Sequence, residues 1–368
     1  MTRGKPTLIE PRIAVAVARR LAGEEELGDS PAIQALISDL QVAVPRSEDL
    51  VAHASGIPRP APVRWAVVDR ATWAEANITG MSSMLEPLAD KVGKRLQTMP
   101  VQARLAQRVL VSAEMGALLG YVSRRVLGQY DVLTSDEAEG SGLRPRRRPP
   151  RRLAPGTVLY FLGTNMIQIS RRYGFVDEDF SLWVALHEVT HRFQFAGVPW
   201  LPERFFGLIR GYFDSLDLDA GSLSERFRGG IRRFSDRSVP PEERNPVYLL
   251  ASPEQRGMLD EIQALMAVVE GHGNYIMDTV GSSVIPTFPR MRELFERRRE
   301  RTNPLQRIVG HLIGLEMKLK QYELGQRFCV EVARRGGDEA LALLWSAPES
   351  FPKLAELREP ELWLRRVA

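Results

Sequence analysis

The spacing of hydrophobic residues predicts a protein that is mostly helical. Apolar side chains recur every three or four positions in many stretches, which is typical of helices that bury one face. These stretches are residues 11–24, 31–44, 69–85, 88–96, 101–130, 165–173, 177–195, 205–214, 218–234, 253–280, 288–301 and 305–335. Segments rich in proline and glycine, such as residues 54–62, separate them. In the stretch 101–130, Gly116 and Gly120 would allow a second helix to approach closely.

One short stretch has a different pattern. Residues 157–162 read Thr-Val-Leu-Tyr-Phe-Leu, and Gly163 follows them. Side chains that are β-branched or aromatic favour a strand. The expected fold class is therefore mainly α, or α+β with a small β element near residues 157–162.

Residues 135–156 have the composition of a flexible, charged loop. Acidic residues and glycines come first, and a run rich in arginine and proline follows from Arg144 to Arg152. Proline interrupts helices and like charges repel each other, so this segment should be solvated. No aromatic side chains interleave with the arginines to stack on bases. We therefore favour a plain solvated loop, and an anion or nucleic-acid contact by Arg144–Arg152 is the lesser alternative.

Composition places the chain among globular proteins. Apolar residues make up 44% and charged residues 26%, and the formal net charge is only +4. No stretch approaches the roughly 18–20 uncharged apolar residues of a membrane span, and the N-terminus lacks an uninterrupted apolar signal segment. The single cysteine, Cys329, excludes a disulfide within the chain and is expected to be a buried apolar residue. We expect a cytoplasmic protein with no membrane contact.

The strongest chemical signal is the sequence His187-Glu188-Val189-Thr190-His191. Residues four apart lie on the same face of a helix, so His187 and His191 could both bind one metal ion. Glu188 is rotated by about 100° from His187, where it could hold a water molecule rather than the ion. The spacing predicts a metal site in which Glu188 is the general base.

A third ligand is expected from the helix at residues 253–280. Zinc hydrolases typically use three protein ligands, and Glu270 and His272 follow an apolar run in that helix. These two are about 200° apart around the helix, so only one of them can readily bind the same ion. We favour Glu270, with His272 as the fallback ligand or a pocket residue. Asn274 could then hydrogen-bond a ligand imidazole.

These residues predict a zinc-dependent hydrolase with one ion per chain. Zinc held by two imidazoles and a carboxylate lowers the pKa of its water toward about 7, and Glu188 would take the proton during attack on a carbonyl. The expected substrate is a peptide or a small-molecule amide. His272, Tyr275 and Tyr212 are alternative stabilisers of the oxyanion. The alternative function is a catalytically degenerate scaffold that acts as a binding protein. The sequence does not indicate an oligomeric state.

Several strings together resemble one known family. They are residues 126–131, residues 186–195 with Pro199-Trp200-Leu201, Glu270-Gly271-His272, and residues 315–322. The chain resembles a zincin-like metallohydrolase family of actinobacteria and green non-sulfur bacteria (Chloroflexi), labelled as associated with deazaflavin coenzyme biosynthesis. The resemblance runs from residue 67 to the C-terminal residues 363–367. It implies a mostly helical zincin-type catalytic fold. The chain is also similar to gluzincins, which carry a glutamate on a later helix and often an aspartate at the position of Asn274.

The resemblance and the composition together suggest a domain organisation. We expect residues 1–62 to form an N-terminal helical extension and residues 63–134 a helical part of the catalytic body. The charged loop at residues 135–156 follows. Residues 157–368 would be the zincin-like catalytic region, forming one integrated domain with residues 63–134.

Overall fold

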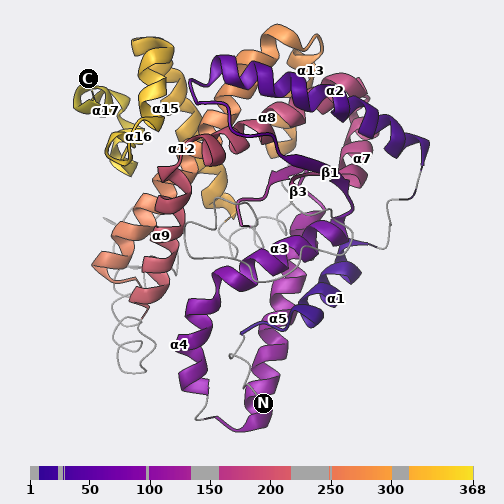
Figure 1. The fold of residues 1–368 in the computed structure, drawn as a ribbon, viewed down its shortest axis with the longest axis vertical. Helices are drawn as coiled ribbons and strands as arrows, with labels where there is room; N and C mark the ends of the chain where they lie inside the picture. The colour runs from indigo at the N-terminus through magenta and orange to yellow at the C-terminus, as the bar shows by residue number, and fades with distance from the viewer. Residues whose placement is uncertain are drawn as a thin grey trace. The chain divides into compact units, whose positions relative to one another are not determined.

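A computed structural model of residues 1–368 gives the fold (Figure 1). It describes residues 8–23, 28, 30–96, 99–133, 157–216, 248, 251–300 and 315–367. Contacts divide the chain into two compact units, residues 1–203 with 273–302, and residues 204–272 with 303–368. The units are described separately below. The predicted boundaries at residues 62, 134 and 156 stay predictions.

The described chain is mainly helical with a small sheet, as the sequence predicts. The helices are α1 (Pro11–Ala22), α2 (Pro31–Ala54), α3 (Arg70–Met84), α4 (Glu86–Leu96), α5 (Val101–Ser123), α7 (Gly163–Tyr173), α8 (Asp177–Gly197), α9 (Trp200–Ser215), α12 (Pro253–Val284), α13 (Phe288–Glu300), α15 (Leu315–Ala342), α16 (Leu354–Arg358) and α17 (Pro360–Val367), with short 3-10 turns at Leu343–Trp345 and Pro348–Ser350. None of these helices is both long enough and apolar enough to cross a membrane. The predicted helix at residues 218–234 and the predicted loop at 135–156 lie outside the described residues.

Helix α2 is longer than its apolar spacing predicts. Its start is as expected, because the hydroxyl of Ser30 accepts a hydrogen bond from the Ile33 N–H and Pro31 occupies the first turn. Its end is not, since the helix continues through Pro45 to Ala54. The buried residues Ser47 and Val51 show that the added turns also face the interior. Packing against α8 therefore extends this helix beyond the predicted end.

The predicted helix at residues 101–130 is wrong in its last seven residues (130 − 123). Helix α5 ends at Ser123, and Gly128–Tyr130 forms strand β2. Strand β2 pairs antiparallel with β3 (Thr157–Leu162), the strand that the sequence predicts. Hydrogen bonds to a strand distant in the sequence override the local helical pattern here.

The sequence does not predict the third strand. Strand β1 (Arg64–Val68) pairs in parallel with β3, which gives the sheet the order β1-β3-β2. With only five residues after a proline-rich connector, β1 carries too little pattern to be recognised alone. Strand β3 is buried along residues 158–162, so it forms the centre of the sheet.

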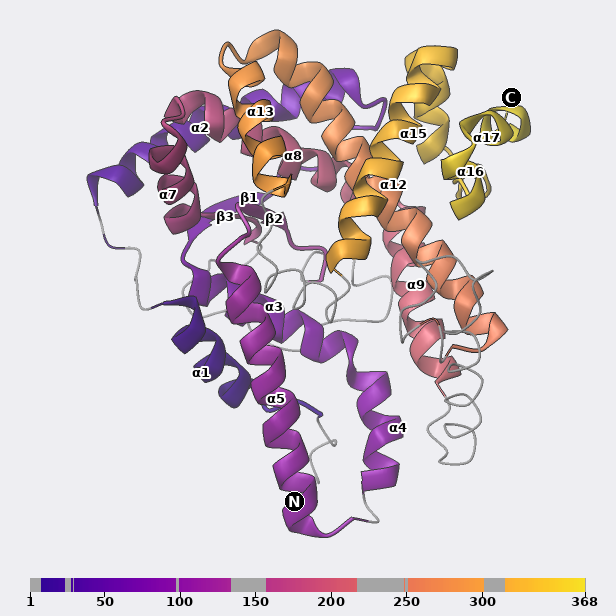
Figure 2. The same ribbon diagram turned by 180° about the vertical axis from the view of Figure 1, so that it is seen from behind.

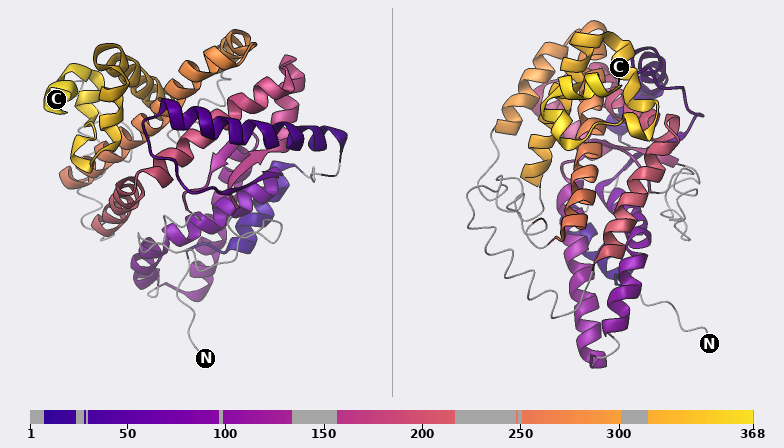
Figure 3. Two further views of the ribbon diagram at one scale, coloured as in Figure 1. Left: turned by 45° about the horizontal axis from the view of Figure 1, so that its top comes forward. Right: turned by 90° about the vertical axis from the view of Figure 1, so that its left-hand side faces the viewer.

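Two pairs of helices in the first unit pack closely against each other, α1 with α5 and α2 with α8. Helix α1 packs on α5 (Figures 1 and 2), where a Cβ added to Gly116 would lie 2.3 Å from the carbonyl oxygen of Ala14. The close approach predicted for Gly116 and Gly120 is thus confirmed, because Gly120 meets the carbonyl oxygen of Ala18 in the same way. Helix α2 lies along α8 (Figure 3) and buries the side of α8 that carries Arg192.

In the second unit, α15 crosses the first part of α12 at very short range. A Cβ added to Gly325 would lie 1.7 Å from the carbonyl oxygen of Ala267, and one added to Gly271 would lie 2.2 Å from the backbone of Gly325. Cys329 on α15 is buried, as predicted, and burial raises the pKa of its thiol. Trp363 of α17 is also fully buried, and its indole N–H donates to the carbonyl oxygen of Ser350 at 2.7 Å.

Candidate metal centre

Helix α8 carries the histidine motif through the interior of the first unit. Three acidic residues, Asp177, Glu178 and Asp179, occupy its first turn, where the positive end of the helix dipole stabilises negative charge. From Phe180 onward most of its side chains are buried. A helix that is buried on several sides is held rigidly by its neighbours, and this fixes the directions of its polar side chains.

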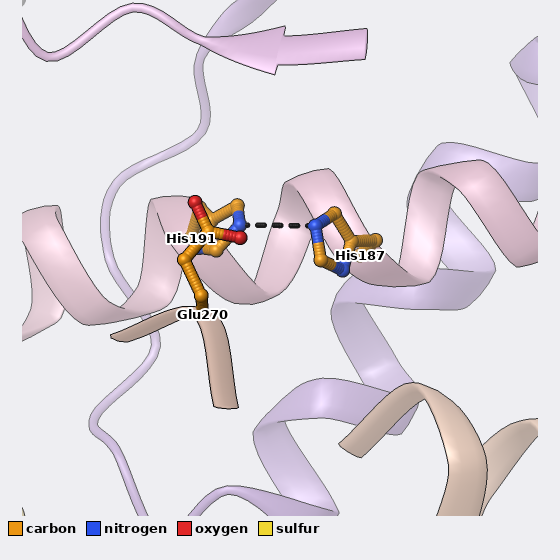
Figure 4. A group of neighbouring side chains, drawn as sticks. All are labelled: His187, His191 and Glu270. Carbon is orange, nitrogen blue, oxygen red and sulfur yellow. Dashed lines mark hydrogen bonds between the residues drawn. The ribbon is translucent and has the colours of Figure 1, made fainter. Parts of the chain in front are cut away.

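The two imidazoles of the motif face each other. His187 and His191 lie one turn apart on α8, and their Nε2 atoms are 3.2 Å apart (Figure 4). Their rings are nearly perpendicular, at 81°. Both side chains are partly buried. The expectation that they share one face of a helix is met by this arrangement.

Glu270 of α12 is the third member of this group. One ligand atom from each of His187, His191 and Glu270 can be chosen so that all three lie within 4.8 Å of one another. Figure 4 shows the Glu270 side chain reaching toward the ring of His191. The backbone of α12 also comes close at Gly273, where an added Cβ would lie 3.2 Å from Cε1 of His191 and 3.4 Å from Cε1 of His187. Glycine at that position leaves space for the imidazoles.

The donor set fits zinc. Zinc–nitrogen bonds of 2.0–2.1 Å in a tetrahedron place two nitrogen ligands about 3.3 Å apart, and the Nε2 atoms of His187 and His191 are 3.2 Å apart. Two imidazoles and one carboxylate are the ligands of several zinc hydrolases, which leave the fourth position open. Within the described residues, this is the group of histidine, cysteine and acidic side chains able to hold a metal ion.

Glu188 lies against the edge strand of the sheet. It is only 7% exposed. A Cβ added to Gly128 of β2 would lie 2.5 Å from Cγ and 2.9 Å from Oε1 of Glu188. Glycine at position 128 therefore leaves space for the Glu188 carboxylate. The sequence does not indicate this role for Gly128, because the contact joins segments 60 residues apart (188 − 128).

His191 has a hydrogen-bond partner on its own helix. The side-chain oxygen of Gln194 lies 2.9 Å from Nδ1 of His191, and Gln194 is fully buried. Gln194 is not among the site residues predicted from the sequence, although residues three apart on a helix are neighbours and the spacing could have indicated it. Asn274, for which such a bond was predicted, is 9% exposed. Its role stays a prediction.

Arg192 connects α8 to two neighbouring segments of the first unit. Its guanidinium forms an ion pair with Glu48 of α2 and donates to the carbonyl oxygens of Pro60 and Ala61 at 3.0 and 2.6 Å. Arg192 is fully buried, so removing one partner would leave a charge without compensation. This connection ties the motif helix to α2 and to the connector before β1.

The other predicted site residues differ in their surroundings. His272 is fully buried, and its ring lies edge-on to Trp345 at 4.9 Å between centroids. Tyr275 and Tyr212 are partly buried. The sequence favours Glu270 over His272 as the third ligand, and the three-residue group contains Glu270. The catalytic roles of His272, Tyr275 and Tyr212 stay predictions.

Comparisons with known proteins agree with this geometry. The chain is similar to a protein from Chloroflexus aurantiacus whose crystal structure is described as that of an inferred hydrolase with a novel fold. The two share 30% identity with a TM-score of 0.65, over 97% of this chain and 98% of the other. No curated protein matches the chain. None of this bears on deazaflavin coenzyme biosynthesis, which stays a prediction. A family described as zincin-like metallopeptidases matches residues 9–364, and the chain belongs to this family.

Proposed function

We propose that this protein is a zinc-dependent hydrolase that cleaves peptide or amide bonds. The observation that carries the proposal is the meeting of His187, His191 and Glu270 beside the buried carboxylate of Glu188. Membership of the zincin-like family supports a metallohydrolase. Zinc, when bound, polarises a carbonyl group and makes water more acidic.

Glu188 would act as the general base in this reaction. It follows His187 directly on α8, so its carboxylate points about 100° away from the ligand side chain. It would accept a proton from the attacking water and deliver it to the nitrogen of the leaving amine. The backbone of Gly128 on one side limits where the carboxylate can move. A fixed carboxylate keeps the proton acceptor in one geometry through the reaction.

The neighbouring sheet supports a peptide as the substrate. In the described part of the chain, β2 is an edge strand of the sheet and lies next to α8. Extended peptides bind proteins by adding a strand to such an edge. A peptide aligned along Gly128–Tyr130 would pass beside Glu188.

The proposal is tested with purified protein and a library of internally quenched peptides. We expect about one zinc per chain and hydrolysis by the wild-type protein. Replacing Glu188→Gln should lower kcat by about 10²–10⁴-fold, because it removes the general base. The zinc content of the variant should be unchanged, since Glu188 is not a ligand.

A matched control separates binding from chemistry. His187→Ala should lose both zinc and activity. A wild-type protein that binds zinc but shows the same low turnover as Glu188→Gln on every peptide would overturn the proposal and favour the alternative of a degenerate scaffold.

A further inference from the structure

Gln194 occupies a position from which it can control one metal ligand. It lies three residues after His191 on α8, and its side-chain oxygen is 2.9 Å from Nδ1 of His191. A carboxamide oxygen only accepts hydrogen bonds, so the hydrogen of this bond belongs to Nδ1. A neutral imidazole with hydrogen on Nδ1 has its free electron pair on Nε2. That atom is the one that faces Nε2 of His187.

We propose that Gln194 is a positioning residue that holds His191 in the tautomer required for metal binding through Nε2. The inference rests on the metal site of the proposed function, but it concerns the imidazole before any ion binds. Without this acceptor, His191 could carry its hydrogen on Nε2, where the hydrogen would block the ligand atom. Partners of this kind fix both the tautomer and the orientation of metal-binding histidines.

Burial of Gln194 favours its hydrogen bond with Nδ1 of His191 over a bond with water. Gln194 has no exposed surface, so water cannot easily replace its oxygen as the acceptor for His191. Breaking a buried hydrogen bond leaves the donor unsatisfied, which costs about 1–3 kcal/mol. The neighbours of Gln194 on α8, Phe193 and Phe195, are buried as well. The side chain of Gln194 is therefore held where its oxygen meets His191.

A glutamine also differs from the carboxylate that often supports a metal-binding histidine. A neutral amide adds no negative charge beside His191. Gln194→Glu keeps the acceptor and should retain metal binding, whereas Gln194→Met keeps the length of the side chain and removes the acceptor.

The decisive experiment measures zinc affinity by competition with a chromophoric chelator. Gln194→Met should raise the Kd for zinc by about 10–100-fold relative to wild type, and Gln194→Glu should keep it close to the wild-type value. Phe193→Leu is the matched control, because Phe193 is adjacent, equally buried and has no hydrogen bond to His191. It should lower the melting temperature of the apo protein without weakening zinc binding.

Nuclear magnetic resonance of the metal-free protein provides a readout that a merely structural role would not change. With ¹⁵N-labelled histidine, long-range spectra should show hydrogen on Nδ1 of His191 in the wild type and a mixture of tautomers in Gln194→Met. Hydrogen on Nε2 in the wild type would overturn the inference, as would an unchanged zinc Kd in a folded Gln194→Met variant. If Gln194→Met does not fold, the wild-type tautomer and Gln194→Glu decide.

The two proposals fail in different ways. A wild-type protein that binds zinc but hydrolyses nothing contradicts the proposed function and leaves the role of Gln194 intact. If the wild type binds no zinc, the proposed function fails, and the tautomer of His191 in the metal-free protein still tests the inference about Gln194.

Discussion

At the scale of single residues, the candidate site depends on two glycines as well as on its polar side chains. Gly273 leaves space for the imidazoles of His187 and His191, and Gly128 leaves space for Glu188. A glycine costs up to about 1 kcal/mol of stability inside a helix or strand. At these two positions that cost is accompanied by a close approach to a group of the site.

Gly128→Ala tests whether the space beside Glu188 matters. The new methyl group would lie 2.5 Å from Cγ of Glu188, so either the carboxylate or strand β2 must shift. Because misplacement by about 1 Å can cost 10²-fold in rate, we expect kcat to fall by about that factor with zinc content unchanged. Peptide hydrolysis and metal analysis are the measurements.

Gly207→Ala is the control for this change, because an added Cβ at position 207 meets nothing within 4 Å. It should leave activity unaltered. Equal activity of wild type and Gly128→Ala would show that Glu188 is not held by β2.

At the scale of secondary-structure elements, close helix crossings fix the helices that carry site residues. Helix α12 carries Glu270, and the next residue, Gly271, touches α15 at Gly325. The crossing therefore restrains α12 at the turn that contains the carboxylate. In the first unit, the anchoring of α8 by Arg192 has a comparable effect on the two histidines.

Gly325→Ala should destabilise this crossing strongly. The added Cβ would lie 1.7 Å from the carbonyl oxygen of Ala267, and backbone cannot yield as a side-chain end can. Overpacking of this kind costs about 1–3 kcal/mol or more. Urea unfolding monitored by circular dichroism measures the loss of free energy of unfolding.

Gly257→Ala lies on the same helix, α12, where an added Cβ meets nothing within 4 Å. There, alanine should be neutral or stabilising by up to about 1 kcal/mol, because its helix propensity exceeds that of glycine. If the two variants unfold at the same urea concentration, the close crossing does not contribute to stability.

At the scale of the whole molecule, metal binding should be linked to folding. The ligands come from α8 and α12, and 55 residues of sequence lie between these helices (252 − 198 + 1). An unfolded chain does not hold three such ligands together, so an ion that binds them favours the folded state.

Removal of zinc with a chelator should therefore lower the melting temperature. Free zinc at about 1,000 times the Kd contributes about 4 kcal/mol to the free energy of unfolding. Differential scanning calorimetry with and without zinc measures this effect. The His187→Ala variant should melt at the same temperature under both conditions, and a zinc-dependent increase in that variant would place the ion elsewhere.

The sequence by itself located most of the described helices and the central strand, and it placed the histidine motif on one of these helices. Apolar spacing locates α8 and α12 because a helix with a buried face has a period that short segments already display. The motif identifies His187, Glu188 and His191 because all three lie within five consecutive residues of one helix. These features are local, so the chain reveals them without knowledge of the fold.

Only the tertiary structure decided which distant groups meet. It groups Glu270, the residue that the sequence favours over His272, with the motif histidines, and it brings Gly128 against Glu188. It also replaces the last part of a predicted helix with β2 and adds β1, since both strands exist through pairing with β3. Contacts between segments far apart in sequence depend on packing and on hydrogen bonds across the sheet, and neither leaves a periodic trace in the local sequence.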